Sequence, residues 1–158
     1  MVRVPDVNEV DGGRRSGWSG VLVGVGVAAF VDETVFHQLL HWHHFYDRST
    51  SDVGLVSDGI FHAFGWFAVV IGLVMVGDLQ RRAQLSKRVL IAGALLGAGA
   101  FQLYDGTVQH KLMGLHQIRY DVDLVVYDWT WNVVAVLLLV AGVGLLYRGR
   151  SPARRGAS

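Results

Sequence analysis

The chain contains no cysteine among its 158 residues. Disulfides, thiolate metal sites and cysteine nucleophiles are therefore excluded. Its three methionines, Met1, Met75 and Met113, do not cluster, so the soft ligands that select Cu(I) are missing. Charged residues make up 17% of the chain, against about a quarter in an average soluble domain. No basic face with interleaved aromatic residues is present, which argues against a nucleic-acid partner.

Apolar residues, by contrast, make up 52% of the chain and cluster in four segments, at 18–44, 53–79, 87–112 and 127–147. Each segment can supply the ~20 residues that cross the hydrocarbon core of a bilayer. Unpaired backbone groups are costly in lipid, so each segment should be helical. The pattern predicts an all-α integral membrane protein, a four-helix bundle with the lipid bilayer as its main partner.

Basic residues predict the orientation of this bundle. Eleven of the fourteen lie before the first span, between the second and third, or after the fourth: Arg3, Arg14, Arg15, Arg81, Arg82, Lys87, Arg88, Arg148, Arg150, Arg154 and Arg155. The positive-inside rule then places both termini in the cytoplasm and the loops at 45–53 and 113–126 outside. We expect cytoplasmic tails at 1–16 and 149–158 around a transmembrane domain at 17–148. The first apolar segment is interpreted as a retained helix, not a signal peptide.

The first and third spans match each other at an offset of 73 residues. Ten of the 24 positions from 20 to 43 are identical to those from 93 to 116, and the pattern Asp-x-Thr-Val-x-His-x-Leu occurs twice, starting at Asp32 and Asp105. The second and fourth spans match more weakly, with Asp58 opposite Asp128 and Gly72 opposite Gly142. The sequence therefore predicts two parallel-repeat helical hairpins, at 17–79 and 87–148, related by an axis along the membrane normal.

Repeated glycines predict how the central helices pack. Gly20 and Gly24 recur as Gly93 and Gly97, with the four-residue spacing that lets membrane helices approach closely. Spans one and three should therefore cross near the axis in their cytoplasmic halves.

A polar layer occupies the outer half of all four spans, and all seven histidines belong to this half. His62 stands opposite Asn132, so the layer should be lopsided. Asp32 and His37 are five residues apart, or about 140° in an ideal helix, so using both at one site would require a distortion. Ionisable groups in membranes usually face the bundle interior.

Imidazoles and carboxylates that converge from several helices are typical of a metal site within a bundle. The candidate ligands are His37, His62, His110, His116, His41, His43, Asp58, Asp128, Asp32 and Asp105. This donor set suits zinc, copper or iron. If a solvent position stays open, bound water could be activated for hydrolysis or oxygen chemistry, and metal handling without turnover is the other use of such a site. A purely structural role, in which these groups bond water or each other, is the simpler alternative.

Two other functions use the same layer. Histidines on facing helices could hold a b-type haem for electron transfer, although all of them lie at one level. Asp32 and Asp105 could also relay protons or ions, although the cytoplasmic half is rich in glycine, valine and leucine. A homo-oligomer or a partner in a membrane complex is compatible with each function.

Four segments carry a family resemblance: 32–44 (DETVFHQLLHWHH), 58–66 (DGIFHAFGW), 104–120 (YDGTVQHKLMGLHQIRY) and 127–132 (YDWTWN). Nearly the whole chain between the tails resembles an uncharacterised, domain-of-unknown-function family of small four-span bacterial membrane proteins with repeated Asp/His motifs. The resemblance implies a multi-pass protein of the bacterial cytoplasmic membrane. It implies no activity.

Overall fold

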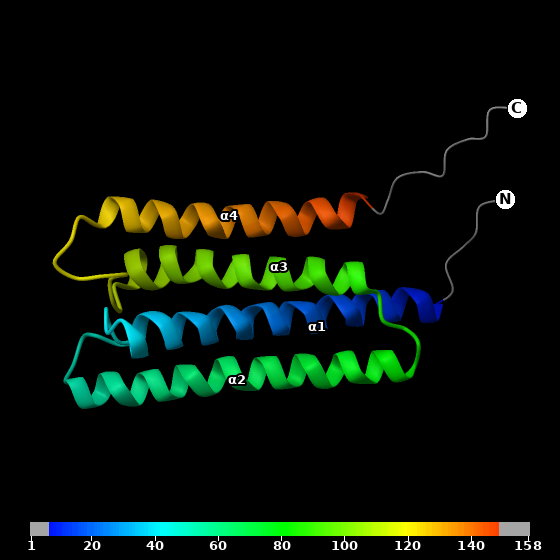
Figure 1. Ribbon diagram of the computed structural model, residues 1–158, viewed down its shortest axis with the longest axis horizontal. Helices are drawn as coiled ribbons and strands as arrows, with labels where there is room; N and C mark the ends of the chain where they lie inside the picture. The colour runs from blue at the N-terminus through cyan, green and yellow to red at the C-terminus, as the bar shows by residue number, and fades with distance from the viewer. Residues whose placement is uncertain (1–6, 149–158) are drawn as a thin grey trace, which may run out of the picture.

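The computed structural model describes residues 7–148, so Arg3 and the predicted tail at 149–158 lie outside the described part. The elements are α1 (Val7–Asp32), η1 (Glu33–Leu39), α2 (Ser51–Arg81), α3 (Lys87–Tyr104), η2 (Asp105–Met113) and α4 (Leu124–Arg148), shown in Figure 1. The segments η1 and η2 are π-helices that continue α1 and α3. The chain thus forms four helical rods that are long and apolar enough to cross a membrane. They confirm the predicted all-α four-helix architecture.

The ends of the first span differ from the prediction. Helix α1 begins at Val7, well before residue 18, and the helical rod ends at Leu39 instead of continuing to residue 44. His41 follows with a φ of 52°, a left-handed conformation that an α-helix cannot contain. The predicted continuation of the first helix to residue 44 was therefore wrong.

The rods lie in the order α2, α1, α3, α4, with α1 and α3 at the centre (Figure 1). Helix α2 packs on α1 and η1, and α4 packs on α3 and η2. Within residues 7–148, α1 and α4 make no close backbone contact. The two hairpins thus meet mainly along the central pair.

Glycines allow the central pair to cross closely. A Cβ atom added to Gly24 would collide with the carbonyl oxygen of Ala94, and one added to Gly97 would collide with that of Val21. Such backbone proximity is what small residues permit in membrane bundles. The predicted role of these glycines in helix packing is confirmed.

The same kind of crossing joins each outer helix to its central helix. A Cβ on Gly72 would lie 3.0 Å from the Ser19 carbonyl oxygen, and one on Gly142 would lie 3.0 Å from that of Ala92. Ser19 and Ala92 are 73 residues apart, and the two glycines are 70 apart. The two hairpins therefore share their internal packing as well as their sequence pattern.

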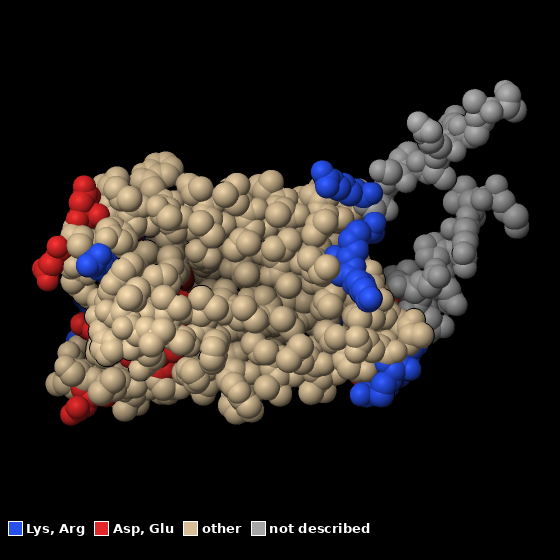
Figure 2. All heavy atoms as spheres, viewed as in Figure 1, with Lys and Arg blue, Asp and Glu red and all other residues tan. Residues whose placement is uncertain are grey.

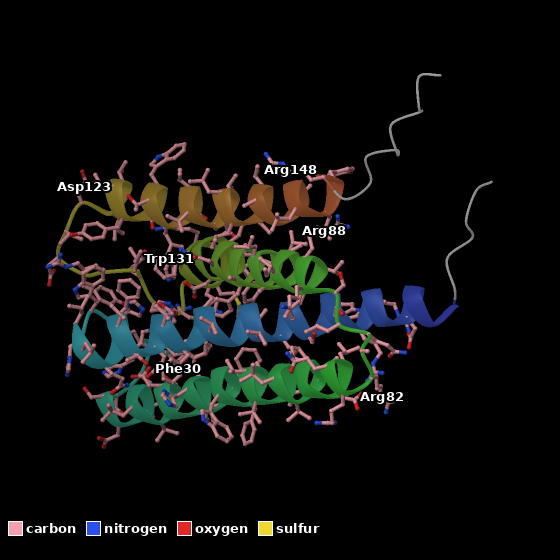
Figure 3. All side chains as sticks on the ribbon, turned by 45° about the vertical axis from the view of Figure 1, so that its right-hand side comes forward. Phe30, Arg82, Arg88, Asp123, Trp131 and Arg148 are labelled. Carbon is pink, nitrogen blue, oxygen red and sulfur yellow. The ribbon has the colours of Figure 1, made fainter. Side chains whose placement is uncertain are left out.

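The two ends of the bundle differ in charge (Figure 2). Arg82, Arg88 and Arg148 lie at one end, and Asp123 lies at the other (Figure 3). At the basic end, Arg15 bonds Asp78 across α1 and α2 at 2.8 Å. The loops at the opposite end hold the histidines that close the candidate site.

Candidate metal centre

The two π-helices carry the repeated Asp and His residues. In η1 the amide of residue i+5 donates to the carbonyl oxygen of residue i. One such bond runs from the Leu40 amide to the Val35 carbonyl oxygen at 2.9 Å. Such bonding widens the helix, so residues five apart come close to one face, and π-segments are frequent at functional sites. Asp32 and His37, and likewise Asp105 and His110, therefore point the same way. This is the distortion that the five-residue spacing required.

His43 and His116 lie in the loops that follow the π-helices, and each is held by the opposite hairpin. The Nδ1–H of His43 donates to the Ile118 carbonyl oxygen at 2.9 Å, and the Nδ1–H of His116 donates to the Phe45 carbonyl oxygen at 2.8 Å. Ile118 is 73 residues after Phe45, so the two bonds are equivalent. A carbonyl that accepts from Nδ1 fixes the tautomer that leaves Nε2 free as a ligand.

Four imidazole rings meet at the centre of this layer. His43 and His116 stack with an interplanar angle of 5° and centroids 4.5 Å apart. His37 lies 4.4 Å from His43, and His110 lies 4.6 Å from His116. The cross distances, 6.0 Å from His37 to His116 and 6.2 Å from His43 to His110, match as well. The rings thus form a pseudo-twofold cluster whose axis passes between His43 and His116. We call these four residues the histidine cluster.

The free nitrogens of this cluster are buried and have no hydrogen-bond partner among the described residues. This is true of Nε2 on His37, His43 and His116 and of both ring nitrogens of His110. All four residues are at most 6% exposed. Burying a polar atom without a partner is costly, so such atoms need an explanation, of which an ion is one. Imidazole nitrogens gathered in this way are a donor set for a transition metal.

Two buried carboxylates border the histidine cluster. Asp105 approaches the Nε2 atoms of His110 and His116 at 3.1 and 3.7 Å, and Asp32 approaches Nε2 of His37 at 3.9 Å. The donor atoms of Asp32, His37 and His43 lie within 4.8 Å of one another, as do those of His43, His110 and His116. His43 belongs to both groups, so one ion or two adjacent ions would have ligands.

The surroundings of the cluster are asymmetric, because the first hairpin has additional carboxylates. Nδ1 of His37 lies 2.9 Å from Glu33 and 3.1 Å from Asp58. Asp58 also accepts from His44 at 2.6 Å and from the Phe45 amide at 2.7 Å. In the second hairpin Gly106 replaces Glu33, and a Cβ there would lie 2.6 Å from the Trp131 ring. His37 is therefore anchored by two carboxylates, whereas an indole occupies the corresponding space beside His110.

Three predicted ligands belong neither to the histidine cluster nor to the carboxylates beside it. His41 is exposed, and it takes the left-handed position that Gly114 takes 73 residues later. His62 packs its ring against Phe30 at 5.1 Å, on the α2 side of α1. Asp128 forms an ion pair with Lys111 at 2.6 Å. The expected asymmetry is present, but it comes from Glu33 and Asp58 and not from the pair of His62 and Asn132.

The two loop histidines are electrostatically suited to remain neutral. Burial, and then the neighbouring imidazoles of His116, His37 and His110, lower the pKa of His43 to about 2. Burial also lowers the pKa of His116 to about 4, although the Asp105 carboxylate opposes this. A neutral imidazole is the form that binds metal, so protons compete weakly at these two positions.

Sequence reasoning missed Glu33 and the two carbonyl groups as members of the site. Glu33 is 1% exposed at the start of η1, and its spacing of four residues from His37 was the only sign in the sequence that it belongs to the site. The carbonyl oxygens of Phe45 and Ile118 could not be identified, because a backbone acceptor leaves no trace in residue type.

These features define a four-span membrane protein with a buried cluster of histidines and carboxylates near one end. A family model described as "Predicted membrane protein (DUF2243)" matches residues 19–149, and the chain belongs to that family. The match confirms the resemblance to a membrane protein family of unknown function. No curated protein and no solved structure matches the chain.

Proposed function

We propose that this protein is a membrane metalloprotein that binds one or two first-row transition-metal ions, zinc, copper or iron, at the histidine cluster. Its ligands are Nε2 of His37, His43 and His116 and one ring nitrogen of His110, completed by Asp32 and Asp105. The observation that carries the proposal is the set of buried ring nitrogens without a hydrogen-bond partner, which fall in two groups that share His43 and whose donor atoms lie within 4.8 Å of one another.

The chemistry of the ligands limits which metal ions the site would bind. Imidazole and carboxylate suit zinc, iron, manganese and Cu²⁺, and no thiolate or thioether lies in the cluster. Each hairpin contributes two histidines and one aspartate, the composition of the facial triad of non-haem iron enzymes, which leaves positions open for substrate or water. A metal ion held there would supply a Lewis acid that activates a bound water as a nucleophile.

The packing of the rings favours a bare ion over haem. A haem must fit between its axial histidines, whereas His43 and His116 stack at 4.5 Å and the other two rings follow at similar distances. Against a proton or ion pathway, the close α1–α3 crossing at Gly24 and Gly97 leaves no room for a polar conduit between the two central helices.

We also propose that the metal centre faces the outside of a bacterial cytoplasmic membrane. Most of the described basic residues lie at the end of the bundle where α1 begins and α4 ends (Figure 2). The histidine cluster lies in η1, η2 and the loops that follow them, near the other end. The positive-inside rule places the basic end in the cytoplasm. Cysteine-accessibility labelling of single cysteines introduced at Ser49 and Ser86 tests this orientation, because only the former should react from outside.

Elemental analysis of the detergent-purified protein tests the metal centre. We expect about one or two equivalents of zinc, copper or iron in the wild type and at least a tenfold lower content in His43→Gln and His116→Gln. The matched control is His41→Gly. It removes a histidine from the same loop and introduces the residue that the second hairpin has at the equivalent position, Gly114. It should keep the metal.

Equal metal content in all variants, with unchanged circular dichroism, would contradict the proposal. Metal lost from His41→Gly but kept in His43→Gln would assign the site to the exposed loop. A Soret band in the absorbance spectrum would show that the protein binds haem and not a bare ion.

A further inference from the structure

A large cavity lies beside the histidine cluster, on the side where α1 and α4 do not meet. Its volume is about 770 Å³, within the range of ligand sites in proteins. Residues of α1, η1, α3, α4 and the loops of both hairpins line it, and Figure 2 shows this face hollowed toward the acidic end. The opening is at the depth of the membrane-spanning helices, so a ligand would enter sideways from the lipid.

One half of the cavity is purely apolar. Ala28 of α1 and Ala98 of α3 form part of its floor, and Val31, Val134 and Leu138 form part of its walls. An unbranched or isoprenoid chain would fit this half, because it offers no hydrogen-bond partner and opens toward lipid.

The other half is aromatic. Phe36, Trp42, Tyr127 and Trp131 line it, with ring centroids 5.1 Å apart for Phe36–Trp42, 5.3 Å for Phe36–Trp131 and 5.7 Å for Trp42–Tyr127. Trp131 points from α4 toward the interior in Figure 3. Offset and edge-to-face packing on such walls stabilises a planar ring.

Asp32 and Gln102 supply polar groups at this aromatic half, and Thr130 also lines the cavity. Asp32, a candidate metal ligand that is only 4% exposed, lies in the cavity wall, and Gln102 reaches it from α3. A carboxylate accepts from a ring hydroxyl, and an amide donates to a ring carbonyl. Ile118 lines the same end, and its carbonyl group orients His43.

The equivalent region of the first hairpin is filled. Phe61 occupies the position 70 residues before Trp131, is 5% exposed, and stacks between Phe45 at 4.7 Å and Phe101 at 5.9 Å. The open cavity is therefore a feature of one side and does not follow from the repeated fold itself.

We propose that this cavity binds a membrane quinone or quinol, with its ring among the four aromatic side chains next to Asp32 and its isoprenoid tail along the apolar half. The proposal rests on the proposed function in that Asp32 belongs to both sites, so the ring would lie beside the metal centre. Planar ring, paired oxygen substituents and apolar tail are the three features that the cavity accommodates together.

Binding of decylubiquinone to the purified holoprotein in detergent tests this proposal, with quenching of tryptophan fluorescence as the readout. We expect saturable quenching, and at least tenfold weaker binding in Ala28→Phe, which places a phenyl ring in the cavity. The control Ala100→Phe adds the same ring to the exposed face of α3 and should bind like the wild type. Farnesol, an isoprenoid alcohol without a ring, should compete at least tenfold less well.

Absence of saturable quenching, equal weakening in both alanine variants, or farnesol that competes as well as decylubiquinone would overturn the proposal; the last result would make the cavity a site for lipid tails. Metal content is measured on the same samples. Protein that holds metal but binds no quinone refutes this inference alone, and protein that binds quinone without metal refutes the proposed function alone.

Discussion

Acidification should destabilise the metal-free protein in a pH range set by its buried loop histidines. The pKa of His116 is about 4 in the folded protein, below its ordinary value of 6.5. Between these two values the unfolded chain binds a proton that the folded protein does not, so the free energy of unfolding decreases as the pH falls. At about 1.4 kcal/mol for each pKa unit, His116 alone accounts for roughly 3 kcal/mol. His43, with a folded pKa of about 2, acts in the same direction and continues to lower pH.

The assay is denaturation of the chelator-treated protein in mixed micelles at pH 7.0, 6.0, 5.0 and 4.5, followed by tryptophan fluorescence. His116→Gln should flatten the decline by about 1.4 kcal/mol per pH unit, because glutamine does not titrate. His41→Gly, which removes an exposed histidine, should leave the slope unchanged. A free energy of unfolding that is constant between pH 6.5 and 4.5, or a slope that His116→Gln does not alter, would refute the reasoning.

Three further outcomes are expected. Gly24→Ala should cost more than about 2 kcal/mol in unfolding free energy, since its Cβ meets the Ala94 carbonyl oxygen, whereas Gly144→Ala should be neutral because nothing lies within 4 Å of that Cβ. Asp58→Asn should weaken metal binding about 10- to 100-fold in titration calorimetry, because it supports a ligand ring, and Asp128→Asn at the equivalent position should not. Added metal at about 100 times its dissociation constant should raise the unfolding free energy by about 2.7 kcal/mol, and a metal-independent unfolding curve would contradict a buried site.

The spans and their central crossing could be predicted because they depend on local composition. Runs of apolar residues mark membrane helices, and the glycines at 24 and 97 mark close backbone contact regardless of the rest of the fold. The helix ends were less predictable. His41 looks like a further helical histidine in the sequence, yet it takes a left-handed backbone conformation that is identified only by its equivalence to Gly114.

The site could be predicted in part. The repeated motif identified Asp32, His37, Asp105 and His110, because identical residues at identical depth converge about an axis. Including His62 and Asp128 required the assumption that α2 and α4 direct their polar residues at the same point. They do not, because Asp128 forms an ion pair with Lys111 and the ring of His62 packs against Phe30. Such competition between partners depends on side-chain geometry that spacing does not encode.

The exchange of hydrogen bonds between loops has an evolutionary consequence. His43 is oriented by Ile118 of the second hairpin, and His116 is oriented by Phe45 of the first. Neither hairpin can prepare its own loop histidine, so an ancestral single hairpin could have formed this centre only by pairing with a second copy of itself. Fusion of the two genes would then have released each copy from symmetry, so that one half could carry Glu33 where the other carries Gly106.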